Sequence, residues 1–143
     1  MKNTIHILCQ VNSAHKYKKY IKEYTSFLLH NLKQKKDINI IITDNQEMAY
    51  IHKKFLSDSS PTDVISFHSY RIKNFLGEII VNFNFAKRES KKQNISLKEE
   101  LARYITHGVL HILGYKDSNP KLKKIMWEKQ ESILKEYYKR KKK

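Results

Sequence analysis

Hydrophobic and polar positions follow one another along the chain in a pattern that predicts strands and helices in turn. Alternation over residues 4–11 and an apolar, β-branched run over residues 37–43 predict two strands, and residues 63–67 and 76–83 predict two more. Between the first two strands, residues 14–33 place apolar side chains at three- and four-residue spacing, which predicts a helix with one buried face. The side chains of that face are Tyr17, Tyr20, Ile21, Tyr24, Phe27 and Leu28.

Two further helices are predicted in the middle of the chain, on either side of a turn and two strands. Asp44 followed by Glu47 is typical of a helix start, and this helix is expected to run to about Leu56. A turn follows over residues 57–63. The second helix is expected over about residues 84–92.

The last two helices are delimited by clear start and stop signals. Ser96 begins a capping box before a helix over residues 97–113, and Gly114 suits the left-handed conformation that ends such a helix. Asn119, which is followed by proline, predicts the cap of the final helix. We expect segment 139–143 to be frayed. The inner side of the final helix is predicted to carry Leu122, Ile125, Met126, Ile133 and Tyr137.

The element order β-α-β-α-β-β-α-α-α predicts the fold class. We expect a single α+β domain over residues 1–143, with about four strands in a mixed sheet and about five helices. A chain of this length buries roughly two thirds of its unfolded surface and can fold on an apolar core alone.

Composition bounds the environment in which the protein works. Cys9 is the only cysteine, so we expect no intrachain disulfide, no disulfide-linked partner and a reducing compartment. No segment approaches the roughly 20 apolar residues of a membrane span. We therefore expect a cytoplasmic protein that does not enter a membrane.

The formal net charge of +15 indicates a nucleic-acid partner, because lysines displace condensed counterions from phosphates. The alternative is codon bias, since Lys, Asn, Ile and Tyr are all abundant, as in proteins from A/T-rich genomes. Charge alone leaves both interpretations open.

Candidate chemistry is concentrated near the end of the fourth helix. His107 and His111 are four residues apart and therefore share one helix face, where two imidazoles can bind one metal ion. Gly108 lies between them at a cost of about 1 kcal/mol relative to alanine. That cost suggests that a ligand or another backbone passes close to the metal. Asp117 follows the predicted helix stop and is near enough to be a third ligand, which leaves a coordination position open for catalysis.

A histidine pair at this spacing can also be two ordinary, half-buried side chains bonded to their neighbours. That alternative leaves the interior glycine and the convergence of three polar groups unexplained. A metalloprotease site is disfavoured because Gly108 stands where the catalytic glutamate is found. Glu100 lies about 10 Å along the helix axis from His107, too far to activate a bound water directly.

Three segments carry a resemblance to a known family. The first is HGVLHILGYKD (residues 107–117), which is similar to the signature H-G-x-L-H-L-x-G-Y-D-H of the YbeY family, bacterial metal-dependent endoribonucleases of ribosomal RNA maturation. The others are SPTDVISF (60–67) and LGEIIV (76–81), which resemble two further family blocks in the same order and spacing. The resemblance covers nearly the whole chain and implies the family fold.

The resemblance implies zinc ligands at the first, fifth and last positions of the signature, which are His107, His111 and Asp117. Asp117 replaces the usual histidine, and Lys116 replaces the usual aspartate before it. Two imidazoles and one carboxylate also suit Fe, Mn or Ni, so we expect one divalent ion, with zinc favoured and those metals as alternatives.

Two other positions depart from the family pattern. Leu56 stands where the family has an arginine, and Lys53 or Lys54, about one turn earlier, would supply the cation instead. His68 stands where the family has a proline. We expect its side chain to be either exposed at a strand end or directed toward the metal cleft.

Site roles follow from the resemblance as expectations. Glu78, where the family has an acidic residue, would act as a base or orient a ligand histidine, and Lys54 would assist catalysis. Cations at the rim would hold the RNA backbone. These RNA-binding residues are Lys53, Lys54, Arg140 and Lys141.

The implied function is a metal-dependent endoribonuclease that acts on single-stranded regions in ribosomal RNA processing, at the 3′ end of 16S rRNA, and in ribosome quality control. Its partners would be ribosomal RNA and the small ribosomal subunit with its assembly factors. Two alternatives stay open: a non-catalytic ribosome-assembly factor with a structural metal, and a metal-dependent hydrolase of a non-nucleic-acid substrate. Whether water or the 2′-hydroxyl attacks is not decided by the sequence.

Overall fold

Four strands form one mixed sheet at the centre of the computed structural model, which describes residues 3–56 and 62–141. The strands are β1 (Ile5–Cys9), β2 (Asp37–Thr43), β3 (Val64–His68) and β4 (Phe75–Asn82). They lie in the order β1-β2-β4-β3, with β1, β2 and β4 parallel and β3 antiparallel to β4. The predicted α+β class and the predicted four-stranded mixed sheet are confirmed.

Five α-helices accompany the sheet in the described part of the chain, as the sequence predicts. The first begins with a 3-10 turn, η1 (Asn12–Tyr17), which was not anticipated. The α-helices are α1 (Lys18–Asn31), α2 (Asn45–Leu56), α3 (Phe83–Gln93), α4 (Leu97–Ile112) and α5 (Pro120–Lys141). Residues 139–141, expected to be frayed, continue α5, and residues 142–143 lie outside the described residues, as do residues 57–61 of the predicted turn.

The predicted helix caps are confirmed in atomic detail. The side-chain oxygens of Asp44, Ser96 and Asn119 each accept a hydrogen bond from the backbone N–H three residues later, at 2.9, 3.1 and 2.9 Å. Each satisfies an N–H group that has no partner within its own helix. Gly114 has a φ of +103°, the left-handed conformation predicted for the end of α4.

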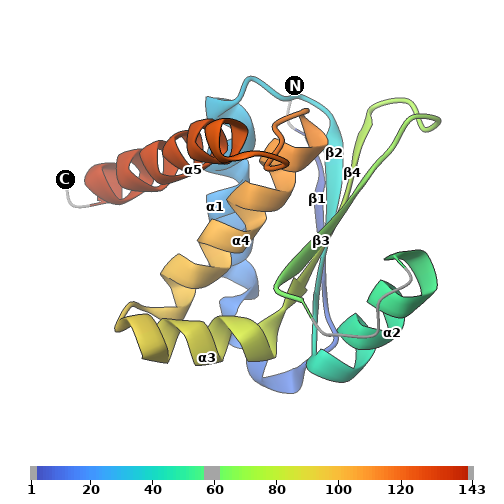
Figure 1. Cartoon of the computed structure of the whole chain (residues 1–143), viewed down its shortest axis with the longest axis vertical. Helices are drawn as coiled ribbons and strands as arrows, with labels where there is room; N and C mark the ends of the chain where they lie inside the picture. The colour runs from blue at the N-terminus through green and yellow to red at the C-terminus, as the bar shows by residue number, and fades with distance from the viewer. Residues whose placement is uncertain (1–2, 57–61, 142–143) are drawn as a thin grey trace.

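The two faces of the sheet are covered unequally (Figure 1). Helices α1 and α4 pack on one face and enclose the main core, whereas α2 covers part of the other face. Successive residues of a strand point to opposite faces. Ile79 of β4 accordingly belongs to the main core beside α4, and Ile80 packs with Met48 of α2 in a smaller cluster.

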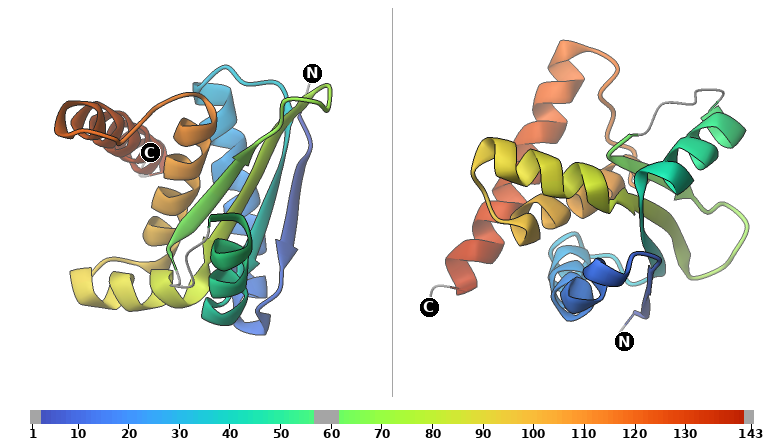
Figure 2. Two further views of the ribbon diagram at one scale, coloured as in Figure 1. Left: turned by 45° about the vertical axis from the view of Figure 1, so that its right-hand side comes forward. Right: turned by 90° about the horizontal axis from the view of Figure 1, so that it is seen from below.

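Helix α4 lies between the sheet and α5. Figure 2 shows α5 on the outer side of α4, away from the strands. Met126, Ile133 and Tyr137 of α5 are buried as predicted. Ile125 is 48% exposed, so its predicted inward orientation is wrong. It lies about 100° around the helix from Met126, which takes the buried position.

The glycine inside α4 is explained by close packing on the sheet. A Cβ atom on Gly108 would lie 3.0 Å from Cγ2 of Ile79 and 3.2 Å from its Cδ1. The close neighbour is therefore a side chain of β4, not the ligand or backbone that the sequence suggested. The glycine therefore lets α4 approach the sheet closely at this point.

The expectations about disulfides and membrane spans can be compared with the residues that the structure describes. Cys9 is buried and forms no disulfide. None of the helices in residues 3–56 and 62–141 combines the length and apolarity needed to cross a lipid bilayer.

Candidate metal centre

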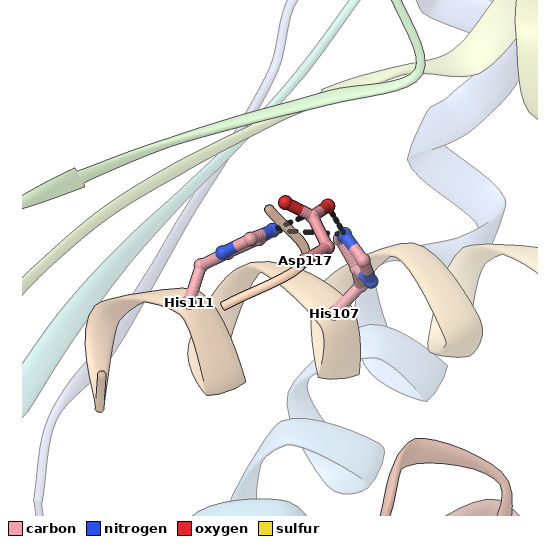
Figure 3. Close-up of side chains that lie close together, drawn as sticks. All are labelled: His107, His111 and Asp117. Atoms are coloured by element: carbon pink, nitrogen blue, oxygen red, sulfur yellow. Dashed lines mark hydrogen bonds and ion pairs between the residues drawn. The ribbon is translucent and has the colours of Figure 1, made fainter. Parts of the chain in front are cut away.

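Three side chains converge at one point above α4 (Figure 3). The Nε2 atoms of His107 and His111 lie 3.0 Å apart, and Oδ2 of Asp117 lies 3.3 Å from Nε2 of His111 and 3.9 Å from Nε2 of His107. Each residue thus offers one ligand atom to a common point, which is what a metal centre requires. The structure therefore brings together the three ligands predicted from the sequence.

The turn after α4 returns Asp117 to the histidines. The N–H of Gly114 donates to the carbonyl of His111, and the N–H of Tyr115 donates to the carbonyl of Leu110, both at 3.0 Å. This pair of bonds is the Schellman motif, which the left-handed glycine allows. The chain reverses there, so the carboxylate two residues past Tyr115 reaches the side chains of the helix it has just left.

Hydrogen bonds at Nδ1 fix the orientation of both imidazole rings. Nδ1 of His111 lies 3.2 Å from the carbonyl oxygen of Tyr115, which can only accept. Nδ1 of His107 lies 2.9 Å from Oε1 of Gln130 on α5. The amide of Gln130 is itself oriented, because its Nε2 donates to a carboxylate oxygen of Glu131 at 3.0 Å. Both Nδ1 atoms therefore carry the proton, and both Nε2 lone pairs point toward Asp117.

This donor set fits a divalent cation. Two neutral rings whose Nε2 lone pairs face each other at 3.0 Å repel, unless a proton or a metal ion lies between them. A tetrahedral ion with ligand distances of about 2.0–2.1 Å holds its ligand atoms about 3.3–3.4 Å apart. The three separations here, 3.0, 3.3 and 3.9 Å, bracket that spacing. Ordinary half-buried histidines do not require such convergence.

A cluster of charged side chains holds Glu131, the hydrogen-bond acceptor of the Gln130 amide. Glu131 accepts two hydrogen bonds from the Arg103 guanidinium, at 2.8 and 2.9 Å, and Arg103 also pairs with Glu99 and the buried Glu100 at 3.1 and 3.0 Å. Burial raises the pKa of Glu131, but hydrogen bonds from Arg103 and Gln130 more than offset this, and the pKa lies below its ordinary value. Hydrogen bonds to Glu131 raise the pKa of Arg103 in turn.

A cleft of about 750 Å³ opens beside the cluster. Its walls come from α3, α4, α5 and the segment that leads into β3, and His107 and Asp117 line it. A cleft of this size accommodates a ligand of nucleotide dimensions. A substrate in the cleft would therefore contact two of the three candidate ligands.

Two predicted catalytic residues lie elsewhere. Glu78 of β4 is one residue before Ile79, so it points to the opposite face of the sheet from α4. Lys54 is exposed on α2, on that same opposite side, beside the rings of Tyr50 and Phe55. Neither side chain lines the cleft. The sheet separates both from the histidines.

The other predicted residues whose side chains the structure describes also lie outside the cluster. Lys53 is exposed on α2, and the side chain of Leu56 lies outside what the structure describes. Arg140 pairs with Glu136 at 3.2 Å and Lys141 with Glu23 at 3.9 Å, near the end of α5, about 15 Å along the helix from Gln130. The ring of His68 packs against Tyr70 with centroids 4.2 Å apart and does not join the cluster.

Sequence reasoning missed Gln130, although a signal for it exists. Met126, Gln130, Ile133 and Tyr137 are spaced by four, three and four residues, which is one face of a helix, and all four are buried. A glutamine on an otherwise apolar face needs a polar partner. His107 and Glu131 are those partners.

The fold and the cluster together define an α+β protein with a candidate divalent-metal centre built from two histidines of one helix and an aspartate beyond it. A family model described as Endoribonuclease YbeY matches residues 5–138. This chain belongs to the YbeY family, and membership supports an endoribonuclease role, that of a nuclease that hydrolyses phosphodiester bonds.

Individual relatives agree. A protein named endoribonuclease YbeY from Sulfurihydrogenibium sp. (strain YO3AOP1) is 35% identical over 93% of this chain and 91% of its own length. A protein of the same name from Wigglesworthia glossinidia brevipalpis is 36% identical over 77% of this chain and 72% of its own. The solution structure of a Thermotoga maritima protein superimposes with a TM-score of 0.71 at 25% identity, covering 97% of this chain and 92% of that one.

Proposed function

We propose that this protein is a metal-dependent endoribonuclease of ribosomal RNA maturation, acting in the cytoplasm on the 3′ end of 16S rRNA and in ribosome quality control. The observation that carries metal dependence is the convergence of the Nε2 atoms of His107 and His111 with a carboxylate oxygen of Asp117 within 3.0–3.9 Å. Ribosomal RNA and the small subunit are the proposed partners, on the grounds of family membership and the net charge of +15.

His107, His111 and Asp117 would hold one divalent ion, with zinc favoured and Fe, Mn or Ni as alternatives. When bound, the ion would supply charge stabilisation at a phosphoryl oxygen or lower the pKa of a water. Gln130 and the Tyr115 carbonyl keep the imidazole protons at Nδ1 and so keep both Nε2 lone pairs available. The exposed lysines of α2 and the cations at the end of α5 would add affinity for the RNA backbone without touching the reacting atoms.

The direct test incubates the purified, zinc-loaded protein with structured ribosomal RNA, beside His111→Ala and beside wild type treated with a chelator. We expect cleavage by the loaded wild type alone. RNA binding without cleavage in all three samples would favour a non-catalytic assembly factor.

A salt titration separates RNA from other substrates. Affinity for RNA should fall steeply between low and moderate salt, because bound lysines release counterions. A turnover rate that does not change with salt concentration would point to a hydrolase of a non-nucleic-acid substrate.

A further inference from the structure

The only tryptophan of the chain lies on the wall of the cleft that is lined by two of the three candidate metal ligands, His107 and Asp117. Trp127 of α5 is 58% exposed, although burying a large apolar ring would stabilise the fold. Two other aromatic side chains line the cleft. Tyr104 is buried, and the Phe85 ring is covered by the Arg88 guanidinium at 4.2 Å. Trp127 is therefore the aromatic ring with the most open surface in the cleft.

The charge of the cleft decides which part of a nucleotide suits it. Although the chain is strongly basic, the cleft carries more acidic than basic side chains, and Arg103 is committed to three glutamates. Away from a bound ion, this surface does not attract phosphate, but its carboxylates can accept hydrogen bonds from amino groups. The acidic side chains are Asp63, Glu89, Glu100, Asp117 and Glu131, and the basic ones are Arg88, Arg103 and Lys123.

We infer that the cleft is a nucleobase subsite in which one unpaired base of the RNA stacks on Trp127, an inference that rests on the proposed function. The base is the uncharged part of the nucleotide and presents both a π-face and amino donors. The adjacent phosphate then lies toward His107 and Asp117, at the end of the cleft where a metal ion would balance its charge. The subsite selects single-stranded RNA, because a paired base cannot leave its stack to enter the cleft without the cost of unpairing.

The test uses the intrinsic fluorescence of Trp127, which no other tryptophan obscures. The zinc-loaded protein is titrated with a short oligoadenylate, under conditions too brief for cleavage, and separately with the same oligomer carrying a fluorescent label. We expect quenching of Trp127 as the RNA binds. In Trp127→Leu, the dissociation constant of the labelled oligomer should rise at least about fivefold, since stacking contributes that much or more per base. Trp127→Phe should fall between the two.

Tyr70→Leu is the matched control, because Tyr70 is an exposed aromatic residue outside the cleft. It should bind the oligomer as wild type does. Zinc content and circular dichroism should be equal in all variants, which excludes an effect through the metal or the fold. If wild type binds RNA and Trp127→Leu binds equally well, or if Trp127 fluorescence does not respond, the subsite is overturned while the nuclease proposal stands. If wild type binds no RNA, both fall.

Discussion

Nδ1 of His107 lies 2.9 Å from Oε1 of Gln130, so α5, which supplies none of the three converging side chains, orients one of them. The amide of Gln130 cannot make these two hydrogen bonds in the flipped orientation. Its nitrogen would then face the Nδ1–H group of His107, and its oxygen would face the carboxylate of Glu131. Nε2 of His107 is therefore available before any ion arrives. This hydrogen bond links α5 to the candidate metal centre.

We expect Gln130→Met, which keeps the length of the side chain but removes its acceptor, to weaken zinc binding about 10- to 100-fold. Competition with a chromogenic chelator measures the change. Gln93→Met is the control, because Gln93 lines the same cleft on α3 but no hydrogen bond links it to either histidine. If Gln130→Met bound zinc as tightly as Gln93→Met, Gln130 would be only a packing residue.

Asp117→Ala should reduce zinc content after dialysis to a small fraction of one ion per chain, because two imidazoles alone leave half of the tetrahedral coordination to water. Asp117→His should restore binding, since an imidazole nitrogen coordinates zinc at about the same distance as a carboxylate oxygen. Elemental analysis of the three proteins gives both the amount and the identity of the metal. One zinc ion per chain in Asp117→Ala would show that Asp117 is not a metal ligand.

Gly77 should tolerate no side chain. It has a φ of +155°, and a Cβ atom there would lie 2.3 Å from the backbone carbonyl oxygen of Phe67 on the paired strand. Because backbone must move, we expect Gly77→Ala to lower the free energy of unfolding by about 1–3 kcal/mol or more. Gly114→Ala, where the φ is also positive but the space is open, should cost about 1–2 kcal/mol. Urea unfolding of both variants tests whether Gly77→Ala is the less stable of the two.

Sequence patterns predicted α4, its caps and the convergence of the three candidate ligands, because all of these depend on neighbours within about ten residues. The i, i+4 spacing fixes His107 relative to His111, and the glycine stop fixes the return of Asp117. Such local geometry is nearly independent of the rest of the fold.

What the sequence did not predict depends on long-range packing. Strand alternation sets Glu78 and Ile79 on opposite faces but does not say which face α4 will cover. The partnership of His107 with Gln130, 23 residues apart, depends on where α5 crosses α4. The same holds for Gly108, whose neighbour Ile79 lies on another element.

The ion pair between Glu131 and Arg103 should make stability depend on pH. The pKa of Glu131 is lower in the folded chain than its ordinary value near 4.3, so its contribution is present above about pH 4.3 and is lost as the pH falls through the folded pKa. Glu131→Gln should therefore lower the free energy of unfolding by about 1–3 kcal/mol at pH 7, and by less as the pH falls below 4. Urea unfolding of the metal-free proteins between pH 7 and pH 3 measures this difference.

Glu128→Gln provides the comparison on the same helix. Glu128 is exposed and lies 3.9 Å from Lys124, so its replacement should change stability by less than about 0.5 kcal/mol at every pH. A Glu131→Gln effect that stays constant down to pH 3 would mean that the loss of stability does not come from the charge of the carboxylate, because glutamine has nearly the same shape as glutamate.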